Sequence, residues 1–162
     1  MFKVTAIIPD TLLIDLDKLI EAVNLGLDEA AKYAKSQLEL PLETWNTPVE
    51  INIDTPEPYA RFIGTEDILY SWINSGTKPH MIPLSPKTDG NIVYAKGGTP
   101  KTQPGVITAG QGSRGTEWRR RKQVLHPGIT PRKFDEIVYE DMVREDILGK
   151  AIQENIDRVV RP

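Results

Sequence analysis

The sequence predicts an α+β protein in which an antiparallel β-sheet packs against a long N-terminal helix and a C-terminal helix, with a long Gly-rich loop in between. Apolar residues recur every three or four positions near both ends, as they do on one face of a helix. Residues 49–54 instead alternate apolar and polar, as a half-buried strand does. The chain of 162 residues has the length of a single domain, so we expect one core within residues 1–162.

The first predicted helix begins at Asp10 or Asp15 and ends near Glu39. Either aspartate can accept hydrogen bonds from the free N–H groups of the first turn, and Pro41 prevents continuation because it has no N–H to donate. Gly26 is expected to weaken the middle of this helix slightly. Its apolar stripe consists of Leu16, Leu19, Ile20, Val23, Leu27, Ala30, Ala34 and Leu38.

The pattern of residues 49–63 predicts an antiparallel hairpin. "VEINID" directs Val49, Ile51 and Ile53 to one face and the intervening polar residues to the other. After a turn that contains two prolines, residues 59–63 are rich enough in aromatic and β-branched side chains to return as the partner strand.

The segment "DILYSWIN" at residues 67–74 is apolar at nearly every position, so it is either a strand buried on both faces or a short helical turn. Its Ile, Tyr and Trp residues favour the strand, which Gly76 would end. Shorter strands are predicted at residues 91–95 and near 122–126.

Residues 96–123 form an insertion rich in glycine with almost no apolar periodicity, which is typical of a mobile loop. Ordering residues 97–118 costs backbone entropy that their few apolar side chains cannot offset, so we expect this part to become ordered on a partner. After Pro131 the helical spacing resumes and continues to the last residues, with Gly149 as the expected break or kink.

Composition excludes several kinds of site. The chain has no cysteine, so thiolate metal sites and cysteine nucleophiles are excluded. Neither Gly-rich run matches a phosphate-binding motif, and no cofactor or metal site is predicted. No apolar run is long enough for a signal peptide or membrane span, so we expect a chain made in the cytoplasm without membrane contact.

The net charge is −3, but the charged residues are unevenly distributed along the chain. Residues 1–60 carry 4 basic and 11 acidic side chains, residues 61–133 carry 12 and 4, and residues 134–162 carry 4 and 8. Surfaces of opposite sign can attract each other between copies, or direct the basic part towards an anionic partner.

The two histidines, His80 and His126, both lie beside prolines. An enzyme could use them as an acid and a base if they met within hydrogen-bond reach in one cleft. The sequence has no nucleophile motif and no metal-ligand spacing, so we expect each ring to stabilise a turn and assign no catalytic residues.

A basic run follows a tryptophan in "EWRRRKQ". Such a run can bind phosphates without sequence preference, and the indole can stack on a base or anchor the loop. Short basic runs also form solvated faces and contacts between subunits. The candidate residues for a subunit or DNA contact are Trp118, Arg119, Arg120, Arg121 and Lys122.

The order of these parts resembles the phage tail-completion proteins, also called neck or head–tail joining proteins, of long-tailed bacteriophages. The resemblance covers about residues 15–145 and rests on "YSWINSGTKPHMIP" after an early hairpin and on "HPGITPRKF" before the last helix. The matching positions are Gly76, Thr77, Pro79, His80, His126, Pro127, Gly128, Arg132 and Phe134.

This resemblance implies a structural virion protein without catalytic activity that forms a ring, of six copies, at the junction of head and tail. Its partners would be further copies of itself and other head–tail connector or tail-tube proteins, with nonspecific contact to the DNA in the channel as an additional expectation. The chain departs from the family in its long insertion at 96–123, and in Asn74, which stands where an acidic residue is common. A small nucleic-acid-binding protein that uses Arg119–Lys122 is the alternative.

Overall fold

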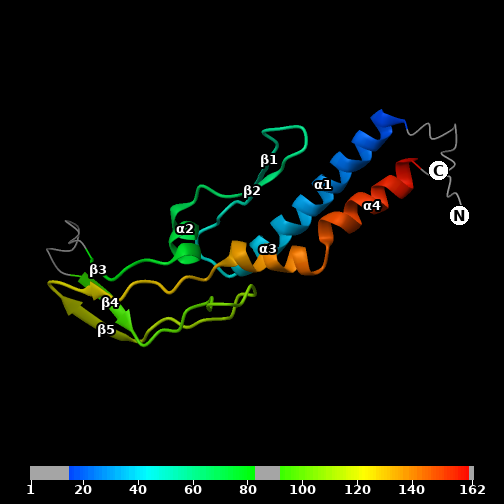
Figure 1. Cartoon of the computed structure of the whole chain (residues 1–162). Coiled ribbons are helices and arrows are strands. Elements are labelled where there is room, and N and C mark those ends of the chain that lie inside the picture. Colours follow the sequence, from blue (N-terminus) through cyan, green and yellow to red (C-terminus); the bar gives the residue numbers. More distant parts are fainter. Residues whose placement is uncertain (1–14, 83–91, 161–162) are drawn as a thin grey trace, which may run out of the picture.

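A pair of long antiparallel helices forms one end of the molecule, two two-stranded β-ladders form the other, and a further ladder lies beside the first helix (Figure 1). The computed structural model describes residues 15–82 and 92–160. The helices are α1 (Leu16–Glu39), α2 (Ile68–Ser75), α3 (Phe134–Arg144) and α4 (Ile147–Val160), with a short 3₁₀ turn η1 (Leu40–Leu42) after α1. The predicted α+β class with antiparallel strands is confirmed. None of the helices in the described ranges is long and apolar enough to cross a membrane.

Helix α1 begins where one of the two candidate aspartates predicts. The Asp15 carboxylate accepts hydrogen bonds from the backbone N–H groups of Asp17 and Lys18, at 3.1 and 3.3 Å. Pro41 lies within η1, where the helix tightens and ends. The other candidate, Asp10, lies outside the described residues.

Helices α1 and α4 pack at very short range, and Gly26 makes this possible. A Cβ atom at Gly26 would lie 2.6 Å from the Cα atom of Ile152 in α4. The glycine therefore has a packing role, whereas the sequence predicts only a weak point in α1. The buried Asn155 adds a polar contact, because its amide donates hydrogen bonds to Glu29 Oε2 at 2.9 Å and to the Ala151 carbonyl at 2.8 Å.

The expected break at Gly149 is wrong, because Gly149 lies inside α4. The C-terminal segment instead breaks between α3 and α4 at Glu145 and Asp146. Asp146 has a positive φ of 50°, a left-handed conformation that aspartate tolerates better than most residues. This single residue redirects the chain from α3 into α4.

Within residues 15–82 and 92–160, the strands form three separate antiparallel pairs in place of one sheet. Strand β1 (Asn52–Asp54) pairs with β2 (Phe62–Gly64), β3 (His80–Met81) with β6 (Leu125–His126), and β4 (Ile92–Lys96) with β5 (Glu117–Arg121). The predicted hairpin corresponds to β1 and β2, and the predicted strands at 91–95 and 122–126 correspond to β4 and β6; Asn91 lies outside the described residues.

The strand predicted at residues 67–74 is wrong, because this segment forms helix α2. The Asp67 carboxylate accepts hydrogen bonds from the N–H groups of Leu69 and Tyr70, at 2.8 and 3.1 Å, and so caps the first turn. Tyr70 and Asn74, four residues apart, are the buried side chains of the helix. Gly76 ends it in a conformation with φ of 76°, as expected.

The core lies between α1, β1, α2 and α3. The rings of Tyr70 and Phe134 meet at 6.0 Å between centroids. Burial raises the pKa of the Tyr70 hydroxyl above its ordinary range, and the negative charge of Asp135 raises it further. The buried cluster consists of Ala34, Leu38, Ile51, Tyr70, Phe134 and Val138.

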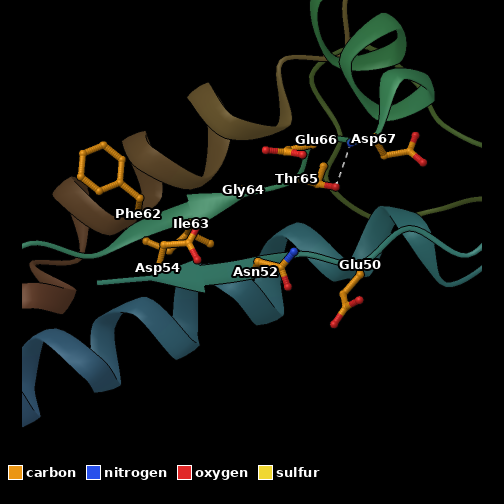
Figure 2. A pocket seen from close by; sticks show the side chains of 9 residues that line it. All are labelled: Glu50, Asn52, Asp54, Phe62, Ile63, Gly64, Thr65, Glu66 and Asp67. Atoms are coloured by element: carbon orange, nitrogen blue, oxygen red, sulfur yellow. Dashed lines mark hydrogen bonds between the residues drawn. The ribbon is translucent and has the colours of Figure 1, made fainter. Parts of the chain in front are cut away.

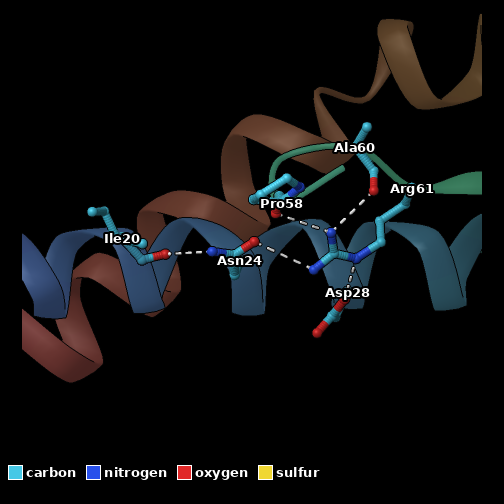
Figure 3. A network of polar contacts seen from close by, with 6 residues as sticks. All are labelled: Ile20, Asn24, Asp28, Pro58, Ala60 and Arg61. Carbon is cyan, nitrogen blue, oxygen red and sulfur yellow. Dashed lines mark hydrogen bonds and ion pairs between the residues drawn. The ribbon is translucent and has the colours of Figure 1, made fainter. Parts of the chain in front are cut away.

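One arginine fastens the β1–β2 hairpin to α1 (Figure 3). The Arg61 side chain, only 8% exposed, forms an ion pair with Asp28 at 2.5 Å. Its other nitrogens donate to the carbonyls of Pro58 and Ala60 and to Asn24 Oδ1, at 3.1 to 3.4 Å. The hairpin is thus held in one position on the helix.

The insertion at 96–123 contains secondary structure that the sequence does not predict. Its basic run forms β5, and a bridge between Thr99 and Ser113 extends the β4–β5 ladder. Beyond this bridge the loop returns to the core, where Ile107 is partly buried and Lys101 Nζ donates to the carbonyl of Thr44. The insertion therefore packs on its own subunit, contrary to the expectation that it has no packing there; its mobility stays a prediction.

Candidate functional site

The two motifs that carry the family resemblance meet in space and form one junction. Thr77 and Ile129 exchange backbone hydrogen bonds of 3.0 and 3.1 Å, and the Thr77 hydroxyl also accepts from the Ile129 N–H at 3.0 Å. Glycine is required on both sides of this contact. A Cβ atom at Gly76 would lie 2.6 Å from the Ile129 carbonyl oxygen, and one at Gly128 would lie 2.3 Å from that of Thr77.

The histidines lie directly beyond this junction and face each other across β3 and β6. Their rings stack with centroids 5.1 Å apart and an interplanar angle of 26°. His80 Nδ1 donates to the Lys78 carbonyl at 2.9 Å, and His126 Nδ1 accepts from the Gly128 N–H at 3.1 Å. Each ring therefore stabilises its own turn through a hydrogen bond to the backbone two residues away.

The surroundings of the histidine pair supply little chemistry. The rings share a pocket but stack instead of forming a hydrogen bond, and no carboxylate belongs to its described lining. Among residues 15–82 and 92–160, no group of three or more His, Asp or Glu side chains could hold a metal ion. The lining consists of Trp72, Thr77, Lys78, His80, His126 and Ile129. The neighbouring Pro79 and Pro127 are exposed.

Asn74 connects α2 to the start of α3. Its side-chain oxygen accepts the backbone N–H of Phe134, the first residue of α3, at 2.7 Å. Lys133 precedes this helix in a left-handed conformation, with φ of 59°, and provides no side-chain cap. The Asn74 side chain therefore supplies the missing N-cap from a distant part of the sequence, and so makes a polar contact at the position where the resemblance leads us to expect an acidic residue.

The predicted basic run forms strand β5, in which successive side chains lie on opposite faces of the ladder. By the register of the ladder, Arg119 and Arg121 share a face with Tyr94, while Trp118 and Arg120 lie on the other. Arg119 Nε donates to Glu117 Oε1 at 2.8 Å. The Arg114 guanidinium lies 5.1 Å from the centre of the Trp118 ring, which is 58% exposed. Arg120, Arg121 and Lys122 are exposed.

Arg132, the motif residue before α3, lies in a pocket of about 390 Å³ that the sequence does not reveal. The residue is 8% exposed, and its Nε donates to Thr102 Oγ1 at 3.4 Å. Lys101 lines the same space. We call this space the Arg132 pocket; its walls are Trp45, Asn46, Thr47, Leu69, Ile73, Pro100, Lys101, Thr102, Ile129 and Arg132.

An acidic face covers the outer side of the β1–β2 hairpin (Figure 2). The alternation in "VEINID" predicts the outward direction of its polar residues, but not that Glu66 and Asp67, which follow β2, join them. Asp67 is already engaged in capping α2. The pocket of about 710 Å³ on this face is lined by Glu50, Asn52, Asp54, Phe62, Ile63, Gly64, Thr65, Glu66 and Asp67.

Comparison with known proteins adds no relative. No protein-family model matches the chain, and neither a curated protein nor a solved structure matches it.

Proposed function

We propose that this chain is a non-enzymatic structural protein that assembles into a ring at the head–tail junction of a long-tailed bacteriophage. The ring, of six copies, would contact other connector or tail-tube proteins of the virion. This proposal takes its starting point from the sequence resemblance at residues 76–80 and 126–134.

The observation that best supports it is the joining of those two motifs into the base of an arm. The Thr77–Ile129 bridge and the His80–His126 pair lead away from the helical core towards β4 and β5 (Figure 1). The motif residues thus shape and aim a projecting element, which is a structural role. An elongated subunit with an arm is suited to contacts with neighbours on two sides.

The surface of the arm also fits an assembly role. Met81 and Leu125 form a cross-strand pair and are 51% and 64% exposed. Trp118 on β5 is similarly open. These side chains belong to the two ladders of the arm, β3–β6 and β4–β5, and large exposed apolar side chains are typical of surfaces that a partner covers.

A deletion of the gene in the phage that encodes the chain tests this function. Without the protein, we expect filled heads and unattached tails to accumulate, and the wild-type gene in trans to restore joined particles. Native mass spectrometry of the purified protein at micromolar concentration should show a monomer or a weak oligomer. The ring is expected to form only on the neighbouring proteins of the virion. Joined, infectious particles in the deletion strain would contradict the proposal.

A nucleic-acid-binding function is the second candidate, and the exposed basic side chains of β5 favour it. Arg119 is engaged with Glu117, which leaves Arg120, Arg121 and Lys122 to contact phosphates. Because Arg120 and Arg121 lie on opposite faces of the ladder, three such contacts are the upper limit, which predicts a slope no steeper than about −2.7 in log K against log salt for duplex DNA. Binding of the isolated chain with this salt dependence would support this candidate, and its absence at low salt would exclude it.

A further inference from the structure

Arg132 is a buried cation without a counter-ion among the described residues. It appears in none of the ion pairs of the described ranges, and its one side-chain hydrogen bond goes to a neutral hydroxyl. Lys101 in the same pocket donates to the Thr44 carbonyl and to Asn46 Oδ1, which are also neutral. A buried charge is costly unless it is paired, so the pocket favours an incoming carboxylate.

The rest of the pocket is suited to an apolar group. Trp45, Leu69, Ile73 and Ile129 contribute its apolar walls, and Leu69 is 37% exposed at its edge. Its volume of about 390 Å³ lies within the range of roughly 300–1,000 Å³ that is usual for sites that bind organic groups. The complementary chemistry is therefore an aromatic or aliphatic side chain with a carboxylate beside it.

The acidic face of the β1–β2 hairpin presents this chemistry. Phe62 is 62% exposed and pairs directly with Asp54 across the strands, so the phenyl ring and the carboxylate share one face. No lysine or arginine belongs to the described lining of this face, whose other carboxylates come from Glu50 and Glu66. Figure 2 shows Phe62 at the end of this surface that is farthest from Asp67.

We propose that the Arg132 pocket of one copy binds Phe62 and the adjacent Asp54 carboxylate of a second copy. This inference rests on the proposed ring. The two surfaces lie on different parts of the subunit, because β1 and β2 lie on one side of α2 and the 97–116 loop lies on the other (Figure 1). A contact between two different patches is head-to-tail, which is the type that closes a ring when its rotation permits.

The chemistry of this contact follows ordinary interface behaviour. An aromatic anchor in a pocket, with less important contacts around it, provides most of the affinity in many complexes. Asp54 would accept charge-assisted hydrogen bonds from Arg132 or Lys101 in a space from which Phe62 excludes water. Arg132 and Lys101, which have no counter-ion among the described residues, thereby obtain one from the next copy.

Disulfide trapping tests the contact directly, because the chain contains no cysteine of its own. One chain carries Gly64→Cys, which leaves Phe62 and Asp54 intact; a Cβ atom at Gly64 meets nothing within 4 Å. A second chain, distinguished by a tag, carries Thr47→Cys at the exposed edge of the pocket. A third carries Gln153→Cys on the exposed side of α4 as the measure of random collisions.

We expect the 64–47 disulfide to form more than about tenfold faster than the 64–153 disulfide, because a specific complex raises the effective concentration of the two thiols. Phe62→Ala, Asp54→Asn or Arg132→Met should each reduce the preference; the first two change exposed residues and keep the test valid if Arg132→Met does not fold. Equal rates for both pairs would overturn the proposal. So would a preference that survives both exposed substitutions.

The same cysteines separate this inference from the proposed function. In joined particles, a Thr47→Cys chain that links to a different virion protein would overturn the assignment to a second copy. If the deletion strain requires the chain for head–tail joining while the 64–47 pair reacts only at the collision rate, the function holds and this contact is wrong. If the deletion strain joins heads and tails normally, the function itself fails, whatever the cross-linking shows.

Discussion

Replacing Gly26 by alanine tests the close approach of α1 and α4. In an isolated helix this change would stabilise by about 1 kcal/mol, because alanine has the higher helix propensity. Here the new Cβ atom would lie 2.6 Å from Ile152 Cα and 2.8 Å from Ile152 N. These are backbone atoms, so they can move only if α4 moves as a whole.

The steric cost should exceed the gain in propensity. Overpacking a core typically costs about 1–3 kcal/mol, and we expect the upper part of this range, about 2–3 kcal/mol, because the atoms in contact include the backbone of α4. We therefore expect Gly26→Ala to lower the free energy of unfolding by about 1–2 kcal/mol in total. At roughly 2–4 °C per kcal/mol for a chain of this size, the melting temperature should fall by about 2–8 °C.

Gly149 provides a matched control within α4. The three atoms nearest to a Cβ atom there all belong to the Asp146 carboxylate, which is the end of a flexible side chain that can rotate away. Gly149→Ala should therefore leave stability unchanged or raise it by up to about 1 kcal/mol. Thermal and urea unfolding followed by circular dichroism measures both variants. A Gly26→Ala protein as stable as the wild type would refute the packing of α1 on α4 described above.

Three further predictions concern the motif region and the insertion. Asn74→Asp should fold normally, because a carboxylate can also accept the N–H at the start of α3. Asn74→Leu should instead lower the free energy of unfolding, measured by urea titration, by about 1–3 kcal/mol. Equal stability of the two variants would contradict the capping role. His80→Ala and His126→Ala should change stability or particle assembly, and any chemical turnover by the wild type that they abolish would disprove a structural role. Trypsin should cleave the free protein faster at Arg114 than at Lys101, whose ammonium is held by the core, and both sites should be protected in assembled particles; equal resistance in both states would remove the assembly role of the loop.

Local sequence signals predict the outer elements well, because those elements depend on contacts near in the chain. Asp15 and the apolar stripe after it define α1, and the alternation at residues 49–54 defines the buried side of β1. Helix α2 shows where this reasoning ends. Eight apolar-rich residues do not distinguish a strand from a helix, and the deciding signal was the cap formed by Asp67.

The candidate site depends on contacts between distant residues, which periodicity cannot reveal. Most residues of β5 are exposed, so the strand has no alternation of apolar and polar residues. Its run of arginines therefore gives no sign of a strand and is interpreted from sequence as part of a loop. His80 and His126 are paired across two strands that the whole insertion separates in the sequence. The Arg132 pocket is completed by Lys101, which comes back to the core from the insertion and contacts Thr44 there. A Gly-rich composition gives no indication of that return.

The antiparallel pairing of α1 and α4 has a practical consequence for imaging. The start of α1 and the end of α4 lie at the same end of the molecule, away from β4 and β5 (Figure 1). With 24 residues, α1 is about 36 Å long, so a fluorescent or gold label joined at this end stands well clear of the arm. A label at this end would then report where the helical end of each subunit lies within a particle, without touching the surfaces proposed to bind its neighbours.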